Sequence, residues 1–178
     1  LGIAFLNEIT RSSPAEAPNQ TLEQLRQQVK DALIQNEQSE QRSEGIDMGF
    51  CSINLDTNQM QYAGAFNPLY LIRNGSLQIF KATRNPIGTH MVERPFAEHT
   101  IQLQKGDRFY MFSDGVPDQI GGEKGFKFKN AQLRNVLLNT AGRPMTTQKA
   151  MLEEKITGWM GTAYKQIDDI LVLGGEIK

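Results

Sequence analysis

The chain has 178 residues, of which 39% are hydrophobic and 22% charged, and its formal net charge is −1. These values suit one globular domain with a substantial core, and the absence of an apolar run of about 18 residues excludes a membrane-spanning segment. The lysines form no strongly basic patch, so nucleic acid is not an expected partner, and the single cysteine, Cys51, excludes an internal disulfide and favours a reducing, cytoplasmic compartment.

The first 36 residues predict a helical hairpin. Residues 1–9 carry an apolar helical stripe but begin with no methionine, cap or signal peptide. This is typical of the rear half of a helix, so we expect the chain to be a fragment of a longer protein. A second helix is expected to begin at Thr21, because Thr21 and Gln24 form a capping-box pattern. Its apolar face consists of Leu22, Leu25, Val29 and Leu33.

Residues 46–113 are predicted to form a mainly β region, because hydrophobic and polar residues there alternate with a period of two. Strands are predicted at 46–55, 59–65, 68–73, 76–81, 98–103 and 107–113. The Asn74-Gly75 pair is typical of a two-residue hairpin turn, and the last two of these strands are expected to form another hairpin.

The C-terminal part predicts helices at 130–140 and 146–160, within a helical region of residues 130–160, and a final strand at 167–174. Helices, antiparallel strands, helices and a strand therefore follow one another along the chain. This order favours an α+β layered sandwich in a single domain of residues 1–178 rather than alternating β-α units.

An acidic residue ends an apolar strand at Asp114, within Ser113-Asp114-Gly115. An Asp-Gly turn after a strand is common and explains this residue without any function. A carboxylate fixed at the end of a rigid strand is also how a sheet presents a hard oxygen ligand to a divalent cation. Both interpretations stay open for this residue alone.

A pair of adjacent acids, Asp168 and Asp169, stands at the head of the final strand. Two neighbouring carboxylates repel each other unless solvent, a cation or hydrogen bonds relieve them. In a strand their side chains would point to opposite faces, so at most one could share a site with Asp114. A solvated strand start explains the pair equally well. The remaining acids Asp107 and Asp118 are expected to be solvated or capping residues.

Three segments in this order resemble the bacterial sporulation-stage-II-E (SpoIIE) type serine/threonine phosphatases, the prokaryotic branch of the metal-dependent PP2C-like superfamily. Ala63–Leu71, followed by Asn74-Gly75, is similar to that family's Ala-Gly-x-x-Pro-Pro-hydrophobic hairpin. Lys105–Val116 resembles its Gly-Asp-x-hydrophobic-Ser/Thr-Asp-Gly motif, and Asp168-Asp169-Ile170 occupies the place of its Asp-Asp-Ile/Val motif. The resemblance covers residues 1–178 and is strongest over 46–174.

The resemblance implies a four-layer α-β-β-α sandwich with two Mn²⁺ or Mg²⁺ ions and hydrolysis of phosphoserine or phosphothreonine by water that the metals activate. By motif it implies that Asp114 and Asp168 are metal ligands with a catalytic role, and that Asp169 orients the site or binds weakly. It also implies a phosphorylated protein substrate, such as an anti-sigma-factor antagonist, for the output module of a longer signalling protein.

Two departures from the family's pattern limit these expectations. Leu171 stands where the family usually has threonine, and the family's other metal ligands lie upstream of residue 1. We therefore expect a sandwich that is incomplete at its N-terminus, a weak or absent metal site, and little or no phosphatase activity in this chain alone. Missing first strands would expose sheet edges, which predicts a homo-oligomer that light scattering would detect.

Two alternatives remain on sequence grounds. The first is a non-catalytic PP2C-like domain that senses a signal or binds a partner, and the second is an unrelated α+β scaffold whose acids are merely solvated. The sequence preceding residue 1 would separate the first alternative from an enzyme, and a Mn²⁺ titration would test the second. No direct membrane contact is expected from this segment, while a membrane tether elsewhere in the parent protein stays open.

Overall fold

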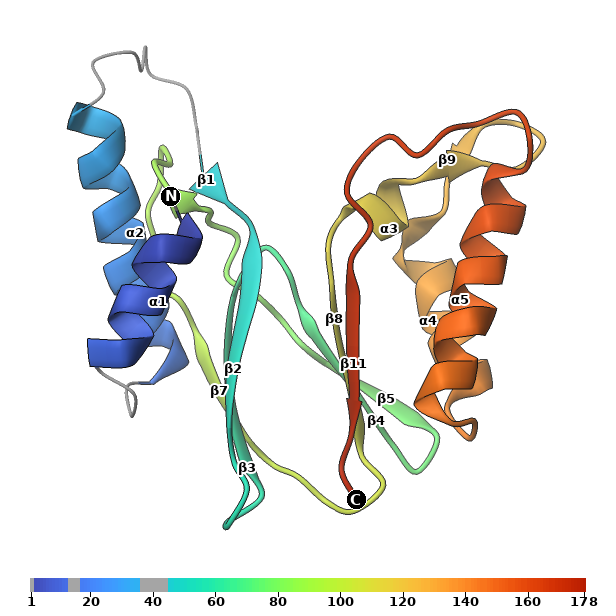
Figure 1. Cartoon of the computed structure of the whole chain (residues 1–178), viewed down its shortest axis with the longest axis horizontal. Helices are drawn as coiled ribbons and strands as arrows, with labels where there is room; N and C mark the ends of the chain where they lie inside the picture. Colours follow the sequence, from blue (N-terminus) through green and yellow to red (C-terminus); the bar gives the residue numbers. More distant parts are fainter. Residues whose placement is uncertain (1, 13–16, 36–44) are drawn as a thin grey trace. The chain divides into compact units, whose positions relative to one another are not determined.

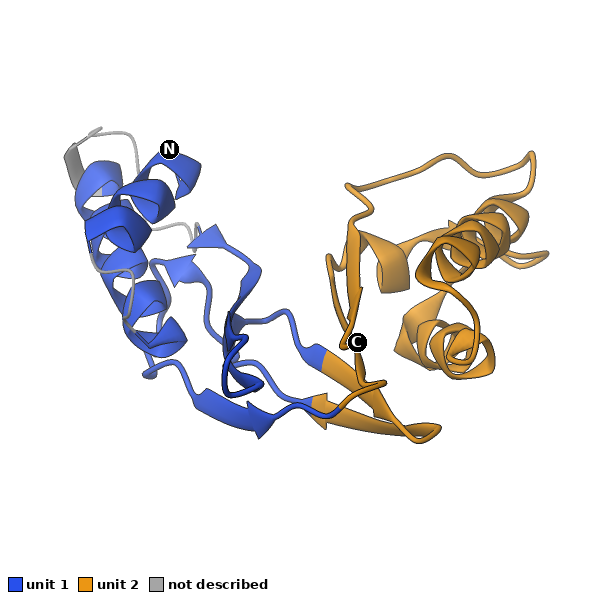
Figure 2. Ribbon diagram, turned by 60° about the horizontal axis from the view of Figure 1, so that its bottom comes forward, with its two compact units in different colours: residues 1–69, 80–104 blue, residues 70–79, 105–178 orange. Residues whose placement is uncertain are grey.

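The computed structural model (Figure 1) describes residues 2–12, 17–35 and 45–178, whereas residues 1, 13–16 and 36–44 are not described. The chain divides into two compact units (Figure 2): unit 1 contains residues 1–69 and 80–104, and unit 2 contains residues 70–79 and 105–178. Each unit has an antiparallel sheet and two longer helices, which confirms the α+β class. The expectation of a single domain over residues 1–178 stays a prediction.

Unit 1 packs two helices against a three-stranded sheet of order β2-β3-β7. Its elements are α1 (Gly2–Ser12), α2 (Pro18–Gln35), β2 (Met48–Asn54), β3 (Gln59–Ala65), β7 (Glu98–Gln102) and the short antiparallel pair β1 (Gly45–Ile46) and β6 (Ile87–Gly88). The core of the unit joins helix residues to strand and loop residues. It consists of Ile9, Leu22, Leu25, Val29, Ala63, Ala65, Ile87 and Phe96.

Helix α2 begins at Pro18, three residues before the start that the capping-box pattern predicts. Proline suits the first helical turn because it has no backbone N–H to satisfy and its φ angle is already fixed near the helical value. Thr21 therefore lies inside the first turn, where its buried hydroxyl donates to the Ala17 carbonyl (3.3 Å) instead of capping. The predicted apolar face is confirmed, since Leu22 and Leu25 are fully buried.

Unit 2 contains a four-stranded sheet of order β11-β8-β4-β5 and the helices α4 and α5 (Figure 1). Its elements are β4 (Leu69–Arg73), β5 (Ser76–Phe80), β8 (Arg108–Phe112), α3 (Gly115–Asp118), β9 (Ile120–Gly121), β10 (Phe126–Lys127), α4 (Lys129–Thr140), α5 (Met145–Met160) and β11 (Val172–Glu176). Aromatic and aliphatic residues of the sheet and of both helices form one core. It includes Tyr70, Ile72, Tyr110, Phe112, Leu133, Leu137, Leu152 and Ile156.

The Asn74-Gly75 turn joins β4 to β5, as predicted, and both of its residues have positive φ angles (49° and 75°), which the favoured two-residue hairpin requires. The second predicted hairpin is wrong. Strand β7 pairs with β3, whereas β8 pairs with β4 on one edge and β11 on the other. Both edges of β8 are therefore already hydrogen-bonded, and none is left for β7.

The final strand begins at Val172 rather than at residue 167. The ladder between β8 and β11 starts at the Phe112–Val172 pair, because after Phe112 the chain leaves the sheet and turns into α3. Residues 164–171 consequently have no regular secondary structure. Asp168 and Asp169 lie in this irregular segment, so the argument that strand alternation points them to opposite faces does not apply.

Gly158 in the last turn of α5 offers a simple stability test. It is exposed, and a methyl group there would meet no atom within 4 Å. We expect Gly158→Ala to raise the free energy of unfolding by about 0.5 kcal/mol, because alanine loses less backbone entropy in a helix than glycine. Gly161, just after the helix, has a φ angle of +57°, so Gly161→Ala should lower stability instead. Urea denaturation of both variants checks the opposite signs, and a shift in the same direction would contradict this reasoning.

Candidate functional site

Asp114 lies directly after β8, where the chain enters the four-residue helix α3. It occupies the N-cap position of α3, with φ −65° and ψ −20°, but its side chain makes no capping hydrogen bond. The side chain is exposed. The Asp-Gly turn therefore accounts for the course of the backbone, while the carboxylate is not used as a cap and is accessible to a ligand.

The backbone of the acid pair, above all the Asp169 carbonyl group, packs against Gly115. A methyl group on residue 115 would lie 2.3 Å from the Asp169 carbonyl oxygen, 2.9 Å from its carbonyl carbon and 3.4 Å from the Asp168 carbonyl carbon. Only glycine leaves room for so close an approach of two backbones. Two segments that are far apart in the sequence thus meet within unit 2, and the residue that directly follows Asp114 contacts the backbone of the acid pair.

Ser113 ties the same two segments together by hydrogen bonds. Its hydroxyl donates to the Asp169 carbonyl (2.7 Å) and accepts from the Leu171 N–H (2.9 Å), and its own N–H donates to the Leu171 carbonyl (3.0 Å). One Asp168 carboxylate oxygen accepts from the Asp169 N–H (2.7 Å). Sequence reasoning finds no function for Ser113. The sequence signal that could have pointed to Ser113 is its position directly before Asp-Gly, in the motif that resembles the family's.

The chemistry of the three acids fits a hard divalent cation. Asp114, Asp168 and Asp169 all have exposed side chains, and carboxylate oxygens are the ligands that Mg²⁺ and Mn²⁺ prefer. Within the described ranges, however, no group of three or more His, Cys, Asp or Glu side chains is arranged to hold a metal ion. In the described part of the chain, these acids alone therefore do not form a complete metal site.

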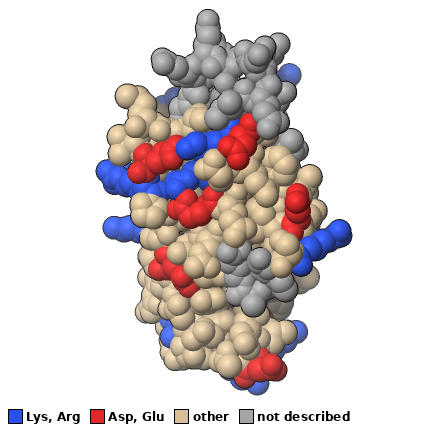
Figure 3. Space-filling model, turned by 90° about the vertical axis from the view of Figure 1, so that its left-hand side faces the viewer, with Lys and Arg blue, Asp and Glu red and all other residues tan. Residues whose placement is uncertain are grey.

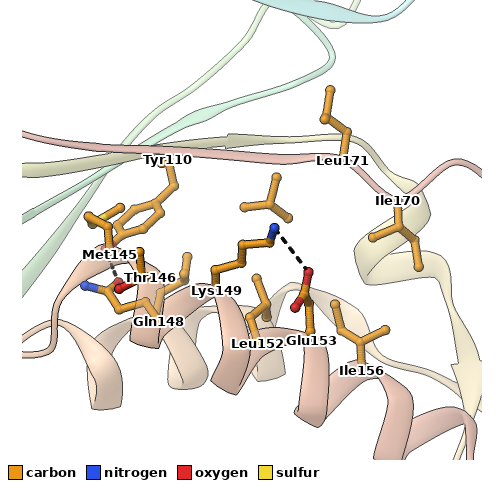
Figure 4. A pocket seen from close by; sticks show the side chains of 13 residues that line it. Tyr110, Met145, Thr146, Gln148, Lys149, Leu152, Glu153, Ile156, Ile170 and Leu171 are labelled. Carbon is orange, nitrogen blue, oxygen red and sulfur yellow. Dashed lines mark hydrogen bonds and ion pairs between the residues drawn. The ribbon is translucent and has the colours of Figure 1, made fainter.

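Unit 2 also contains a pocket of about 550 Å³ between α5 and residues 170–174 (Figure 4). Most of its walls are apolar, and Lys149 and Glu153 form an ion pair on α5 (3.7 Å). The Tyr110 hydroxyl donates to Gln148 Oε1 (2.6 Å), and burial raises the pKa of this tyrosine, so it stays a neutral donor. None of the three candidate acids lines this pocket, which is therefore separate from the candidate metal site.

Basic and acidic side chains intermix on the face of unit 1 that carries the helices (Figure 3). Arg26 on α2 pairs with Glu23 of the same helix, and Lys30 pairs with Glu93 (2.7 Å) in the loop before β7. This surface therefore carries both positive and negative charges. In the described part of the chain, no helix is both long enough and apolar enough to span a bilayer.

Comparisons with known proteins place the chain in a family. Residues 3–178 match the family model of stage II sporulation protein E (SpoIIE). A search of curated proteins finds no match. The SiaA-PP2C domain of Pseudomonas aeruginosa has a similar structure, with a TM-score of 0.86 at 24% sequence identity, over 100% of this chain and 67% of that chain.

Two further solved structures are similar. The first contains the PP2C phosphatase domain and a fragment of the regulatory domain of Bacillus subtilis SpoIIE (TM-score 0.69, 16% identity, 99% of this chain and 48% of that chain). The second is the Ser-Thr phosphatase MsPP of Mycobacterium smegmatis in complex with cacodylate (TM-score 0.67, 13% identity, 99% and 80%). At these identities the structural likeness establishes the fold, and the family model establishes membership. The chain belongs to the SpoIIE family and has the α+β fold of PP2C-type serine/threonine phosphatase domains.

Proposed function

We propose that the protein to which this chain belongs is a metal-dependent phosphoserine/phosphothreonine phosphatase, with Asp114 and Asp168 as metal ligands and Asp169 as a weaker or orienting acid. The observation that carries the proposal is the close packing of Gly115 against the backbone of Asp168 and Asp169, chiefly the Asp169 carbonyl group. This contact brings together the two motifs that resemble the family's metal-binding motifs. Family membership supports the reaction class.

When bound, Mn²⁺ or Mg²⁺ supplies a Lewis acid that activates water and neutralises phosphoryl charge. The chain's own contribution is to hold carboxylates in place before any ligand arrives. Asp114 is fixed between β8 and α3, and the Asp169 carbonyl group is fixed by Ser113 and Gly115. Such preorganisation lowers the cost of assembling a charged site. Two carboxylates alone bind divalent ions weakly, so the complete site draws further oxygen ligands from the rest of the protein.

The substrate class follows from the same proposal. A phosphorylated protein, of the kind represented by anti-sigma-factor antagonists, would be the partner of a phosphatase that acts as the output module of a signalling protein. One relative, SpoIIE of Bacillus subtilis, is described as a cell fate determinant with a regulatory domain beside its phosphatase domain, which supports this role. The chain spans 67% and 48% of the first two similar structures, and the activity is proposed for the whole protein. The inactivity of this chain alone and its self-association stay predictions.

The experiment that tests the proposal is a Mn²⁺ titration by calorimetry of the full-length protein, together with an assay on a phosphothreonine peptide. Asp114→Asn and Asp168→Asn should each lower Mn²⁺ affinity by about tenfold or more and reduce hydrolysis, because each removes a charged oxygen ligand. Asp169→Asn should have a smaller effect. Asp56→Asn is the matched control, because Asp56 is an exposed acid in the turn between β2 and β3.

Unchanged Mn²⁺ binding in both Asp114→Asn and Asp168→Asn would overturn the shared metal site. A second candidate function, a non-catalytic PP2C-like domain that binds a partner, is favoured by one observation: the described residues contain no cluster of three potential ligands. Binding of phosphoprotein without Mn²⁺ binding or hydrolysis in the full-length protein would support that second candidate.

A further inference from the structure

Ser113 is placed to control where the acid pair lies. The ladder between β8 and β11 ends at Phe112 and Val172, and the preceding residues 164–171 have no regular secondary structure. The Ser113 hydroxyl continues the attachment beyond this end, since it bonds on both sides of Ile170, to the Asp169 carbonyl (2.7 Å) and the Leu171 N–H (2.9 Å). Where β8 and the segment before β11 separate, the Leu171 N–H thus bonds to the Ser113 side chain instead of to a backbone carbonyl.

A hydroxyl is the group that this position requires. It donates one hydrogen bond and accepts others, so one oxygen satisfies a carbonyl and an amide N–H at the same time. Alanine would leave both of these backbone groups without this partner. The N–H of Ser113 would still bond to the Leu171 carbonyl (3.0 Å), but nothing in that bond restrains Asp169.

We propose that Ser113 is a positioning residue of the phosphatase, which acts through the backbone of residues 169–171 and does not touch metal or substrate. The inference rests on the proposed function. Gly115 has no side chain, so the Asp169 carbonyl can lie close against the start of α3. The hydrogen bond from the Ser113 hydroxyl keeps the carbonyl there. Together they hold the acid pair beside Asp114. Without the hydroxyl, residues 168–171 sample more positions and the carboxylates are less often in place to bind a cation.

The test uses Ser113→Ala and Ser113→Thr in the full-length protein. In the metal-free protein, hydrogen exchange of the Leu171 amide should be about tenfold faster in Ser113→Ala, because this N–H loses its acceptor. Mn²⁺ affinity measured by calorimetry should fall about 10-fold to 100-fold, the usual effect of removing a group that orients a metal ligand. Ser113→Thr keeps the hydroxyl and should restore both properties. Ser52→Ala, at an exposed position of β2, is the matched control.

The outcomes separate this inference from the proposed function. If Asp114→Asn weakens Mn²⁺ binding but Ser113→Ala does not, the positioning role is overturned and the metal site stands. A loss of thermal stability in Ser113→Ala without a change in Mn²⁺ affinity would likewise overturn the positioning role, because Ser113 would then only stabilise the fold. Absence of Mn²⁺ binding in the unsubstituted protein would overturn the proposed function and the positioning role with it. Rescue by threonine of both exchange and affinity is the supporting result.

Discussion

Replacing Gly115 with alanine is expected to lower the free energy of unfolding by about 1–3 kcal/mol, the usual cost of adding volume to a packed site. It is also expected to weaken Mn²⁺ binding by the full-length protein about 100-fold. The added methyl group would lie 2.3 Å from the Asp169 carbonyl oxygen. A side chain could rotate away from such a contact, but a backbone carbonyl cannot. The Asp169 carbonyl and the backbone on either side of it must therefore shift, and the acid pair shifts with them.

Gly142→Ala is the matched control for this prediction. Gly142 is exposed between α4 and α5, and a methyl group there would meet no atom within 4 Å, so its unfolding free energy should change by no more than about 0.5 kcal/mol. Urea denaturation and Mn²⁺ calorimetry of both variants provide the comparison. Unchanged stability and unchanged Mn²⁺ affinity in Gly115→Ala would show that α3 and the acid pair do not pack closely. The geometric basis of the proposed site would then be lost.

Local features of the fold could be predicted because their causes are local. Strand β3 has the predicted bounds, and α4 and α5 each begin one residue before their predicted starts. The Asn74-Gly75 turn is fixed by the two residues that form it. In each case the hydrophobic period or the turn chemistry of a few neighbouring residues decides the outcome.

Strand pairing could not be predicted in the same way. The expected hairpin of residues 98–113 assumes that consecutive strands are neighbours, which holds only about two-thirds of the time. Here β8 lies between β4 and β11, and the choice depends on a strand that comes much later in the chain. No local signal carries that information.

For the candidate site, the sequence proposes a set of acids but does not predict how their segments are arranged. Sequence motifs single out Asp114 and Asp168, but the expected strand at residues 167–174 places the acid pair in the wrong kind of structure. The β11 ladder stops at Val172, and the Ser113 side chain holds the residues before it. A side-chain bond between distant segments has no periodicity, so the sequence pattern could not show it.

Asp107, an acid outside the candidate site, also has a side-chain partner that the sequence pattern could not predict. It is expected to be solvated or capping, yet its side chain is 1% exposed and pairs with Arg73. The Arg73 Nε donates to one carboxylate oxygen (2.8 Å) and a terminal nitrogen donates to the other (2.5 Å). These hydrogen bonds raise the pKa of the arginine, so the guanidinium stays charged. The pair links the end of β4 to the start of β8, and the Asp107 carbonyl accepts from the Ile177 N–H (2.9 Å).

Asp107→Ala is expected to lower the free energy of unfolding by about 3 kcal/mol, the lower end of the range for breaking a buried ion pair, because the Arg73 side chain keeps 22% exposure and some access to water. Asp118→Ala breaks an exposed pair with Lys127 (2.8 Å) and should change stability by no more than about 0.5 kcal/mol. Urea denaturation of both variants gives the comparison.

A double-mutant cycle with Arg73→Ala separates the ion pair from other effects of the Asp107 substitution. Removing Asp107 alone leaves a charged guanidinium without its bidentate partner, whereas removing both side chains leaves no unpaired charge. The double variant should therefore be more stable than the sum of the single changes predicts, by about 1–3 kcal/mol. Additive losses would mean that Asp107 stabilises the protein through contacts other than Arg73. A small loss in Asp107→Ala, similar to that of Asp118→Ala, would mean that water reaches the pair and that the ends of β4 and β8 are held by backbone pairing alone.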